Sequence, residues 1–144
     1  MKSYKSLVLL ILSICLACPA LLYAVENPVS IKKLKVEYAE MPLGIDVEKP
    51  RFSWQMVVPD TERGYSQKAY QIIVTDEKGS LVWDSGKVSS DLSLNIEYAG
   101  APLQPATCYF WTVNVWNQRG EQSSETSWFE TGLMSKTSPY EGWS

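Results

Sequence analysis

No histidine occurs among the 144 residues of the sequence. This absence excludes Ser-His-Asp and Cys-His catalytic sites, zinc sites that need an imidazole ligand, and histidine as a general base. Cysteine is scarce too, with three residues, of which Cys15 and Cys18 lie in an apolar N-terminal stretch. Cys108 would then be alone in the mature chain. It cannot form an intramolecular disulfide, and as a nucleophile it would lack a histidine to activate it.

Helical periodicity is also missing beyond the first 24 residues, and there are no internal repeats or low-complexity linkers. Setting aside residues 1–24 of the 144 leaves 120 residues, enough for one sandwich-sized core but not for a large enzyme. The composition, 45% hydrophobic and 20% charged, is that of an ordinary globular domain.

The N-terminal segment has the features of an export signal. Two lysines precede an apolar run over residues 7–24 that contains small residues at Ala20 and Ala24. This pattern predicts a signal peptide over 1–24 and a periplasmic or secreted protein, with cleavage after Ala24 or, alternatively, after Ala20. A lipid-bearing Cys18 is a third alternative and would give an outer-membrane lipoprotein. A retained membrane anchor is disfavoured because a proline interrupts the run.

Charge gives no indication of a nucleic-acid partner. The chain carries 13 Lys and Arg against 16 Asp and Glu. Because two of the basic residues and none of the acidic ones lie in residues 1–24, the mature chain would have a net charge of −5. Binding to nucleic acid or to an anionic membrane surface needs the opposite balance. A membrane contact is therefore expected only if Cys18 is lipidated.

Short alternating segments separated by Gly, Pro, Asn and Asp predict an all-β protein. The expected strands cover residues 31–38, 51–57, 69–76, 80–85, 92–98, 103–120 and 127–133. About seven such strands predict a two-layer antiparallel β-sandwich over residues 25–133, followed by an irregular tail over 134–144. The apolar faces expected to point inward are Phe52, Trp54 and Met56; Tyr70, Ile72 and Val74; Leu92, Leu94, Ile96 and Tyr98; and Tyr109, Trp111, Val113 and Val115.

The segment before the clearest strand resembles a fibronectin type III domain. Leu103, Pro105, Thr107 and Tyr109 match the L-x-P-x-T-x-Y pattern that opens a late strand in that family, and Trp54 is similar to its core tryptophan. The resemblance implies a fibronectin type III or immunoglobulin-like fold. At such a corner a tyrosine buries its ring while its hydroxyl bonds to nearby backbone.

A narrower resemblance covers nearly all of residues 31–133. The strings LKVEYAEMPLGIDVEKPRFSWQM (34–56), WDSGKV (83–88) and YAGAPLQPATCYFWTVNVW (98–116) are similar to the N-terminal domain of bacterial α-L-rhamnosidases, glycoside hydrolase family 78. EGWS, at residues 141–144, resembles the stretch that leads into the next domain of that family.

The resemblance implies an accessory role without catalysis. Family members use two glutamates of a separate (α/α)₆ barrel to hydrolyse terminal α-L-rhamnose with inversion, and no position of this chain corresponds to that barrel. We therefore expect either a fragment of a longer enzyme or a stand-alone copy of its accessory domain, with the catalytic domain in cis as partner in the parent enzyme. A stand-alone carbohydrate-binding module that takes rhamnose-containing carbohydrate is the alternative, and a complete small hydrolase a remote third.

No catalytic residue, metal ligand or cofactor is expected. The loop carboxylates occur in pairs, at Asp46 and Glu48, Asp60 and Glu62, and Asp76 and Glu77. Such pairs are usually solvated or form turns, and a small sandwich offers no deep pocket that would raise one carboxyl pKa above the other. A calcium site in the 60–62 loop is equally weakly supported.

Tryptophan and phenylalanine supply the candidate binding residues. Trp54 and Trp111 lie on apolar strand faces and are expected in the core, and Trp83 in the core or at its rim. Phe110 and Trp116 oppose the core face of their strand. Phe110, Trp116 and Trp128 are therefore the candidates for an exposed aromatic patch. Docking against a neighbouring domain is the preferred function of this patch, ahead of sugar binding.

Overall fold

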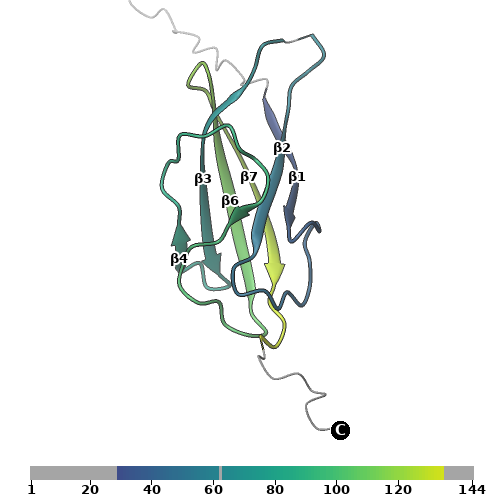
Figure 1. Ribbon diagram of the computed structural model, residues 1–144, viewed down its shortest axis with the longest axis vertical. Coiled ribbons are helices and arrows are strands. Elements are labelled where there is room, and N and C mark those ends of the chain that lie inside the picture. Colours follow the sequence, from purple (N-terminus) through teal and green to yellow (C-terminus); the bar gives the residue numbers. More distant parts are fainter. Residues whose placement is uncertain (1–28, 62, 135–144) are drawn as a thin grey trace, which may run out of the picture.

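The computed structural model describes residues 29–61 and 63–134, and these form an all-β sandwich (Figure 1). Seven strands follow one another: β1 (Ser30–Val36), β2 (Arg51–Val57), β3 (Gln67–Asp76), β4 (Leu81–Asp84), β5 (Ile96–Glu97), β6 (Cys108–Asn117) and β7 (Gln122–Glu130). The described residues include no helix with the length and hydropathy of a membrane span. The predicted signal peptide at 1–24, with Cys18, and residues 135–144 of the predicted tail lie outside them.

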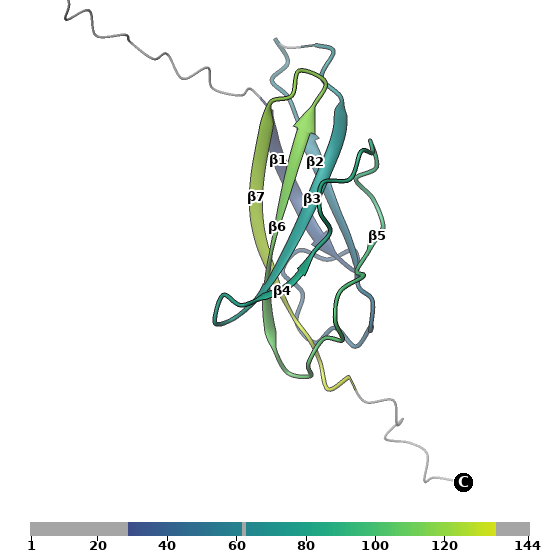
Figure 2. The same cartoon turned by 90° about the vertical axis from the view of Figure 1, so that its left-hand side faces the viewer.

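Two antiparallel sheets pack face to face, as the alternating sequence predicts (Figures 1 and 2). One sheet has the strand order β1-β2-β5 and the other β4-β3-β6-β7. The longest pairings lie in the second sheet, where β6 is flanked by β3 and β7. The all-β two-layer prediction is confirmed.

Side chains of period two from both sheets fill the space between them. The predicted inward faces of β2, β3 and β6 are buried except for Met56, which is half-buried at the edge of the core, and Phe52, Ile72 and Val113 are completely inaccessible to solvent. The rings of Phe52 and Trp111 meet across the sandwich with centroids 4.8 Å apart. Burying such a side chain contributes roughly 1.5–3 kcal/mol to folding, so this layer is the main source of stability.

The tyrosine corner predicted from residues 103–109 is present. The Tyr109 ring is buried, and its hydroxyl oxygen accepts a hydrogen bond of 2.8 Å from the Gln104 backbone N–H. Leu103 is buried beneath the same connection. The corner fixes how the chain passes from the first sheet into β6.

Three predicted strands differ by more than two residues from the structure, and one of them is the 103–120 segment, which forms a strand only over Cys108–Asn117. The second is the strand predicted over 92–98. Residues 92–95 are not a strand, and Leu92 and Leu94 are 61% and 65% exposed instead of facing the core. Hydrogen bonds from a distant strand hold this segment in place: the Gln67 side-chain amide donates to the backbone carbonyls of Ser90 and Leu92. These bonds override the alternation of the leucines, so only Ile96–Glu97 pair with β2.

The last strand begins earlier than predicted and ends earlier too. β7 starts at Gln122, in a polar stretch whose backbone pairs with β6 over its whole length. The hydroxyls of Thr112 and Thr126 also lie 2.8 Å apart across this pair. Backbone pairing of polar residues leaves no hydrophobic period in the sequence, so alternation could not reveal it. Residues 131–133 lie beyond the end of β7, where Thr131 and Gly132 pair with Ile45 in the loop between β1 and β2.

Candidate functional site

The structure brings two of the three predicted aromatic residues together. Phe110 and Trp128 are register partners on β6 and β7, on the outer face of the four-stranded sheet. Thr75 and Leu81 continue the same row toward the edge strand β4. Phe110 is 43% exposed and Leu81 64% exposed, so this row forms an apolar band across the sheet, here called the aromatic strip: Leu81, Phe110 and Trp128.

Trp116 does not belong to the aromatic strip. It lies at the other end of β6, opposite Gln122, and the Lys87 ammonium stands 4.1 Å from the centroid of its ring. Hydrogen-bonded side chains occupy the rows between. Asn114 donates to Gln71 and accepts from Gln122. The three residues predicted as one patch therefore occupy two separate places on one face.

The remaining strand tryptophans lie where the sequence places them. Trp54 and Trp111 are 1% exposed, which confirms both as core residues. Trp83 is half-buried and packs its ring against Tyr98, with centroids 5.1 Å apart, at the rim of the core.

A second site, which alternation did not predict, lies where the chain leaves β7. Residues 130–134, here called the exit segment, run beside the loop between β1 and β2. The Ile45 N–H donates to the Glu130 carbonyl at 2.9 Å, and the Gly132 N–H donates to the Ile45 carbonyl at 2.8 Å. Ile45 and Thr131 form a parallel bridge. These bonds extend the sandwich beyond its last strand.

Side chains complete the fixation of the exit segment. Thr131 is 1% exposed, and its hydroxyl donates to the Gln104 carbonyl at 2.6 Å while accepting from the Thr107 N–H at 3.0 Å. The Asp46 carboxylate accepts from the Met134 N–H at 2.9 Å. A Cβ on Gly132 would stand 2.4 Å from this carboxylate oxygen, so a side chain there would displace Asp46.

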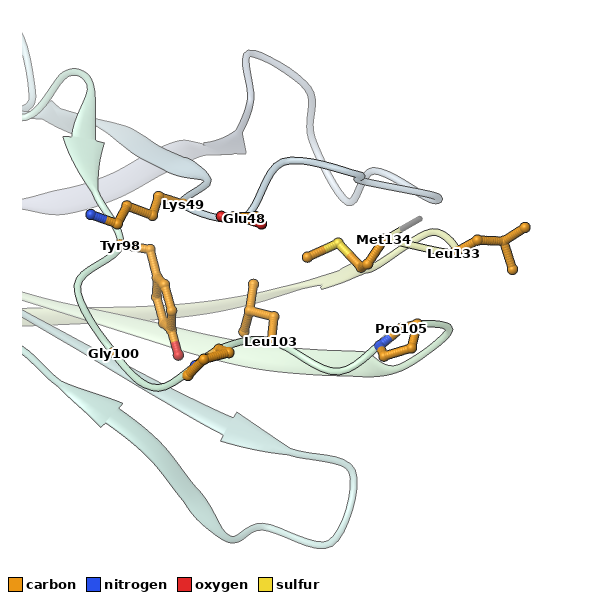
Figure 3. A pocket seen from close by; sticks show the side chains of 9 residues that line it. Glu48, Lys49, Tyr98, Gly100, Leu103, Pro105, Leu133 and Met134 are labelled. Carbon is orange, nitrogen blue, oxygen red and sulfur yellow. The ribbon is translucent and has the colours of Figure 1, made fainter. Parts of the chain in front are cut away.

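Exposed apolar side chains surround this exit. Leu43 is 69% exposed and Leu133 78% exposed, and Met41 and Val47 are exposed in the same loop. A hollow of about 470 Å³ opens beside them, between the loop, the segment after β5 and the exit segment (Figure 3). Its lining includes Tyr98, Leu103 and Met134. We call this end of the molecule the exit face: residues 41–49, 98–105 and 132–134.

The wall of the hollow is rigid where Tyr98 forms it. The Tyr98 hydroxyl donates to the Ala101 carbonyl at 2.5 Å. Burial, with a smaller contribution from Tyr109, raises the pKa of Tyr98 to about 12, so the ring stays neutral under ordinary conditions. Gly100 lies directly against this ring and Trp83, since a Cβ at Gly100 would come within 2.6 Å of both. Such contacts leave little room for rearrangement.

Two of the loop carboxylates, Asp46 and Asp76, have structural roles. Asp46 holds the exit segment, and Asp76 accepts from the backbone N–H groups of Lys78 and Ser80 in the β3–β4 turn, which lowers its pKa. Glu62, of the predicted 60–62 pair, lies outside the described residues. Within residues 29–61 and 63–134, no cluster of three or more Cys, Asp or Glu is arranged to hold a metal ion.

Cys108 is a free, half-buried cysteine with the electrostatics of an unreactive thiol. Burial raises its pKa, and Glu77 and Glu130 nearby raise it further. A thiolate nucleophile needs the opposite environment.

Sequence reasoning missed the exit face because its apolar residues have no period. Met41, Leu43 and Val47 lie in a loop with two prolines, where neither strand nor helix spacing applies. One signal was available in the sequence: several apolar residues lie in a loop, and apolar residues that a loop leaves exposed mark a contact surface.

Comparison with known proteins gives a consistent result. The family model described as "Rha78A-like, N-terminal immunoglobulin domain" matches residues 31–135. An alpha-L-rhamnosidase of Streptomyces avermitilis is 50% identical over 105 residues, which cover 69% of this chain and 10% of that protein. An alpha-L-rhamnosidase of Formosa agariphila is 33% identical over 120 residues, covering 78% of this chain and 12% of that protein.

The fold comparison agrees with the sequence comparison. The crystal structure of the Streptomyces avermitilis alpha-L-rhamnosidase complexed with L-rhamnose matches with a TM-score of 0.68 and 45% identity, over 74% of this chain and 11% of that chain. This chain thus spans about a tenth of the length of the relatives that it matches.

Proposed function

Because the chain belongs to the Rha78A-like N-terminal immunoglobulin domain family, we propose that it serves as the accessory, non-catalytic domain at the start of an exported α-L-rhamnosidase-like enzyme. In this proposal the exit face packs against the polypeptide that follows the domain, and the catalytic carboxylates belong to that later part. Export is proposed on the pattern of residues 1–24.

The observation that carries the docking role is the fixed exit segment beside an exposed apolar surface. Thr131 and Asp46 fix the direction in which the chain leaves, and Leu43 and Leu133 stand uncovered next to that point. A flexible linker would need neither feature. A neighbour that follows directly in the chain meets the exit face first, and burying it would stabilise the contact by about 25 cal/mol per Å².

The non-catalytic role rests on the state of the carboxylates. Inverting hydrolysis needs one carboxylic acid with a raised pKa to protonate the leaving oxygen and one carboxylate to activate water. Asp76 has a lowered pKa, and the Asp46 carboxylate already accepts a hydrogen bond from the Met134 N–H. We expect the purified chain to release no nitrophenol from a nitrophenyl α-L-rhamnoside, and hydrolysis by the pure chain would contradict this role.

A chimera tests the docking role. Residues 29–134 of this chain would replace the matching domain of the Streptomyces avermitilis enzyme, and thermal unfolding and rhamnoside hydrolysis would be measured. We expect Leu43→Asp together with Leu133→Asp to lower the unfolding temperature of the chimera by at least about 2 °C. The same pair should leave the isolated chain within about 1 °C, because both side chains are exposed there.

Leu92→Asp is the matched control for this experiment. Leu92 is 61% exposed but lies away from the exit face, so its change should affect neither protein. Equal effects of the Leu43 and Leu133 changes in chimera and isolated chain would contradict docking at the exit face.

Binding of rhamnose-containing carbohydrate at the aromatic strip is the second candidate function. The side-by-side placement of Phe110 and Trp128 on an open sheet face favours it, because a flat apolar band suits the face of a pyranose ring. Titration with rhamnose-containing oligosaccharides, followed by tryptophan fluorescence, tests it. A response that Trp128→Ala abolishes and Trp116→Ala leaves intact would support it, and no response at about 1 mM sugar would contradict it.

A further inference from the structure

A smaller hollow of about 220 Å³ lies on the outer face of the three-stranded sheet, away from the exit face and the aromatic strip. It opens between β1, β2 and the segment that precedes β5. We call it the basic hollow and define it by six of its lining residues: Lys33, Lys35, Tyr38, Ser53, Gln55 and Asn95.

The charge at this place is opposite to that of the chain. The whole chain has a net charge of −3, yet two lysines of one strand line the basic hollow. Among the described residues, the carboxylate closest in sequence, Glu37, is already paired with Arg51 at 2.9 Å, and Glu97 with Lys49 at 3.6 Å. The ammonium groups of Lys33 and Lys35 thus remain available to an external anion.

Unusual backbone conformations gather around the basic hollow. Seven described non-glycine residues have a positive φ, and four of these line or flank it: Lys33 (51°), Glu37 (47°), Tyr38 (68°) and Asn95 (57°). A left-handed conformation costs an L-residue roughly 1–2 kcal/mol. Such residues persist where the surrounding structure enforces them, and they are concentrated at sites that bind ligands.

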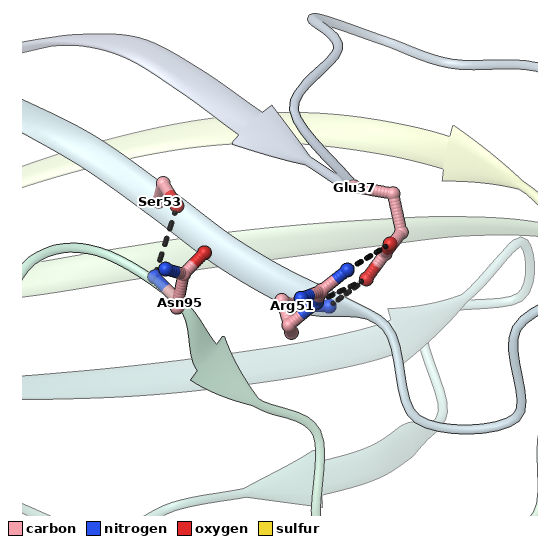
Figure 4. A network of polar contacts seen from close by, with 4 residues as sticks. All are labelled: Glu37, Arg51, Ser53 and Asn95. Atoms are coloured by element: carbon pink, nitrogen blue, oxygen red, sulfur yellow. Dashed lines mark hydrogen bonds and ion pairs between the residues drawn. The ribbon is translucent and has the colours of Figure 1, made fainter.

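The turn that carries Tyr38 is enforced in this way. Val36 and Ala39 exchange two backbone hydrogen bonds, of 2.9 and 3.1 Å, around the Glu37–Tyr38 pair. Both carboxylate oxygens of Glu37 accept hydrogen bonds from the Arg51 guanidinium, and one of them also accepts from the Arg51 backbone N–H (Figure 4). The Arg51 guanidinium lies 5.0 Å from the centroid of the Tyr38 ring.

Tyr38 therefore stands on a turn held by backbone hydrogen bonds, with Arg51 against its ring and the rest of the residue open to solvent. Its side chain is 61% exposed although the turn beneath it is rigid. A turn that is already held in place reduces the conformational entropy lost when a flat partner binds the ring above it. The C–H face of a pyranose ring is such a partner.

Amide and hydroxyl groups complete the hollow. The Ser53 hydroxyl oxygen accepts from the Asn95 backbone N–H at 3.2 Å, which leaves the Ser53 proton free to be donated (Figure 4). The side-chain amides of Gln55 and Asn95 each offer donors and an acceptor. These are the groups that recognise sugar hydroxyls.

We propose that the basic hollow binds an acidic saccharide, with the pyranose ring on Tyr38, its carboxylate at Lys33 and Lys35, and its hydroxyls at Ser53, Gln55 and Asn95. This site goes beyond the accessory role proposed above and does not depend on it. Such a site would hold the molecule near an acidic polysaccharide.

Binding of trigalacturonate to the purified chain, followed by amide chemical shifts, tests the proposal. We expect saturable shifts at Lys33, Tyr38 and Asn95. Changing Lys33 and Lys35 together to alanine should weaken binding at least about tenfold, as should Tyr38→Ala, whereas Tyr38→Phe keeps the ring and should keep the affinity. A thermal melt of each variant would verify folding.

Matched controls separate this site from general charge attraction. Lys68→Ala together with Lys78→Ala changes the net charge equally at two exposed lysines elsewhere and should leave binding unchanged. Three outcomes would overturn the proposal: equal weakening by the control pair, equal binding of a neutral trigalactoside, or absence of saturation at about 10 mM trigalacturonate. Equal shifts with inorganic sulfate would do so too, since they would show a site for simple anions.

Discussion

At the scale of single residues, the exit segment depends on the contact between Asp46 and Gly132. A methyl group at Gly132 has space only if the Asp46 carboxylate swings away, because the three nearest atoms belong to that carboxylate. Swinging away breaks the hydrogen bond to the Met134 N–H. The two residues are therefore energetically coupled.

A double-mutant cycle tests this coupling. We expect Gly132→Ala and Asp46→Ala each to lower the free energy of unfolding by about 1 kcal/mol, the typical contribution of one hydrogen bond. The double variant should lose little more than either single variant, because both remove the same bond. Urea denaturation measures all three, and additive losses would contradict the assignment.

The ion pair of Glu37 makes stability depend on pH. A side-chain hydrogen bond with Arg51, supported by a backbone bond and charge attraction, lowers the pKa of Glu37 below its usual 4.5. A carboxylate with a lowered folded pKa contributes stability that is complete above pH 4.5 and is lost as the pH falls through the folded pKa.

Glu37→Gln removes this contribution. At pH 7 the variant should be less stable than the native chain by about 1 kcal/mol, since Arg51 is partly exposed and solvent weakens the pair. The difference should shrink as the pH falls below 4.5, and chemical denaturation over pH 7 to 3 measures it. A constant difference over this range would show that Glu37 acts through packing instead.

At the scale of elements, the segment before β5 shows why alternation can mislead. Leu92 and Leu94 have the spacing of an inward face, but Gln67 and Trp54 hold the backbone of this segment by hydrogen bonds that turn both leucines outward. We expect Leu92→Ser to change the free energy of unfolding by less than about 0.5 kcal/mol.

Ile72→Ser is the matched comparison on a strand whose alternation was right. Ile72 is completely buried, so its loss should reduce the free energy of unfolding by several kcal/mol, in the range of large core truncations. Equal effects of the two serine substitutions would show that Leu92 is buried in solution.

The sequence thus predicts elements where side-chain burial determines them. The faces of β2, β3 and β6 and the tyrosine corner follow from the positions of residues such as Trp54, Val113 and Tyr109. It does not predict what backbone hydrogen bonds determine. The polar start of β7 and the exit segment at Thr131 are of this kind, and so is the separation of Trp116 from Phe110, since strand length and register set it.

At the scale of the whole molecule, one continuous core joins both sheets. Phe52 of β2 contacts Trp111 of β6 and Phe129 of β7, with ring centroids 4.8 and 6.0 Å apart. Neither sheet can therefore lose its packing while the other keeps it. Beyond residue 24, Cys108 is the only cysteine, so no disulfide adds a separate constraint.

We expect residues 25–144 to unfold in a single cooperative transition. Far-ultraviolet circular dichroism, which follows the strands, and tryptophan fluorescence, which follows the core, should give coincident curves. Addition of a reducing agent should leave the midpoint unchanged. Separate transitions for the two probes would contradict a shared core.

The exit segment also determines how the molecule would respond to tension. β1 and β7 lie side by side. At one end of the sandwich the Ser123 hydroxyl donates a hydrogen bond to the Val29 carbonyl, and at the other Ile45 forms a parallel bridge with Thr131. The start of β1 and the end of β7 lie at opposite ends of the long axis of the sandwich (Figure 2). A force that pulls these two ends apart would act along the strands. We expect it to stretch the two backbone hydrogen bonds of Ile45, to Glu130 and Gly132, at the same time. Since the unfolding barrier governs forced unfolding, we expect the pairing of Ile45 with Thr131 to slow unfolding when the domain is stretched from its two ends.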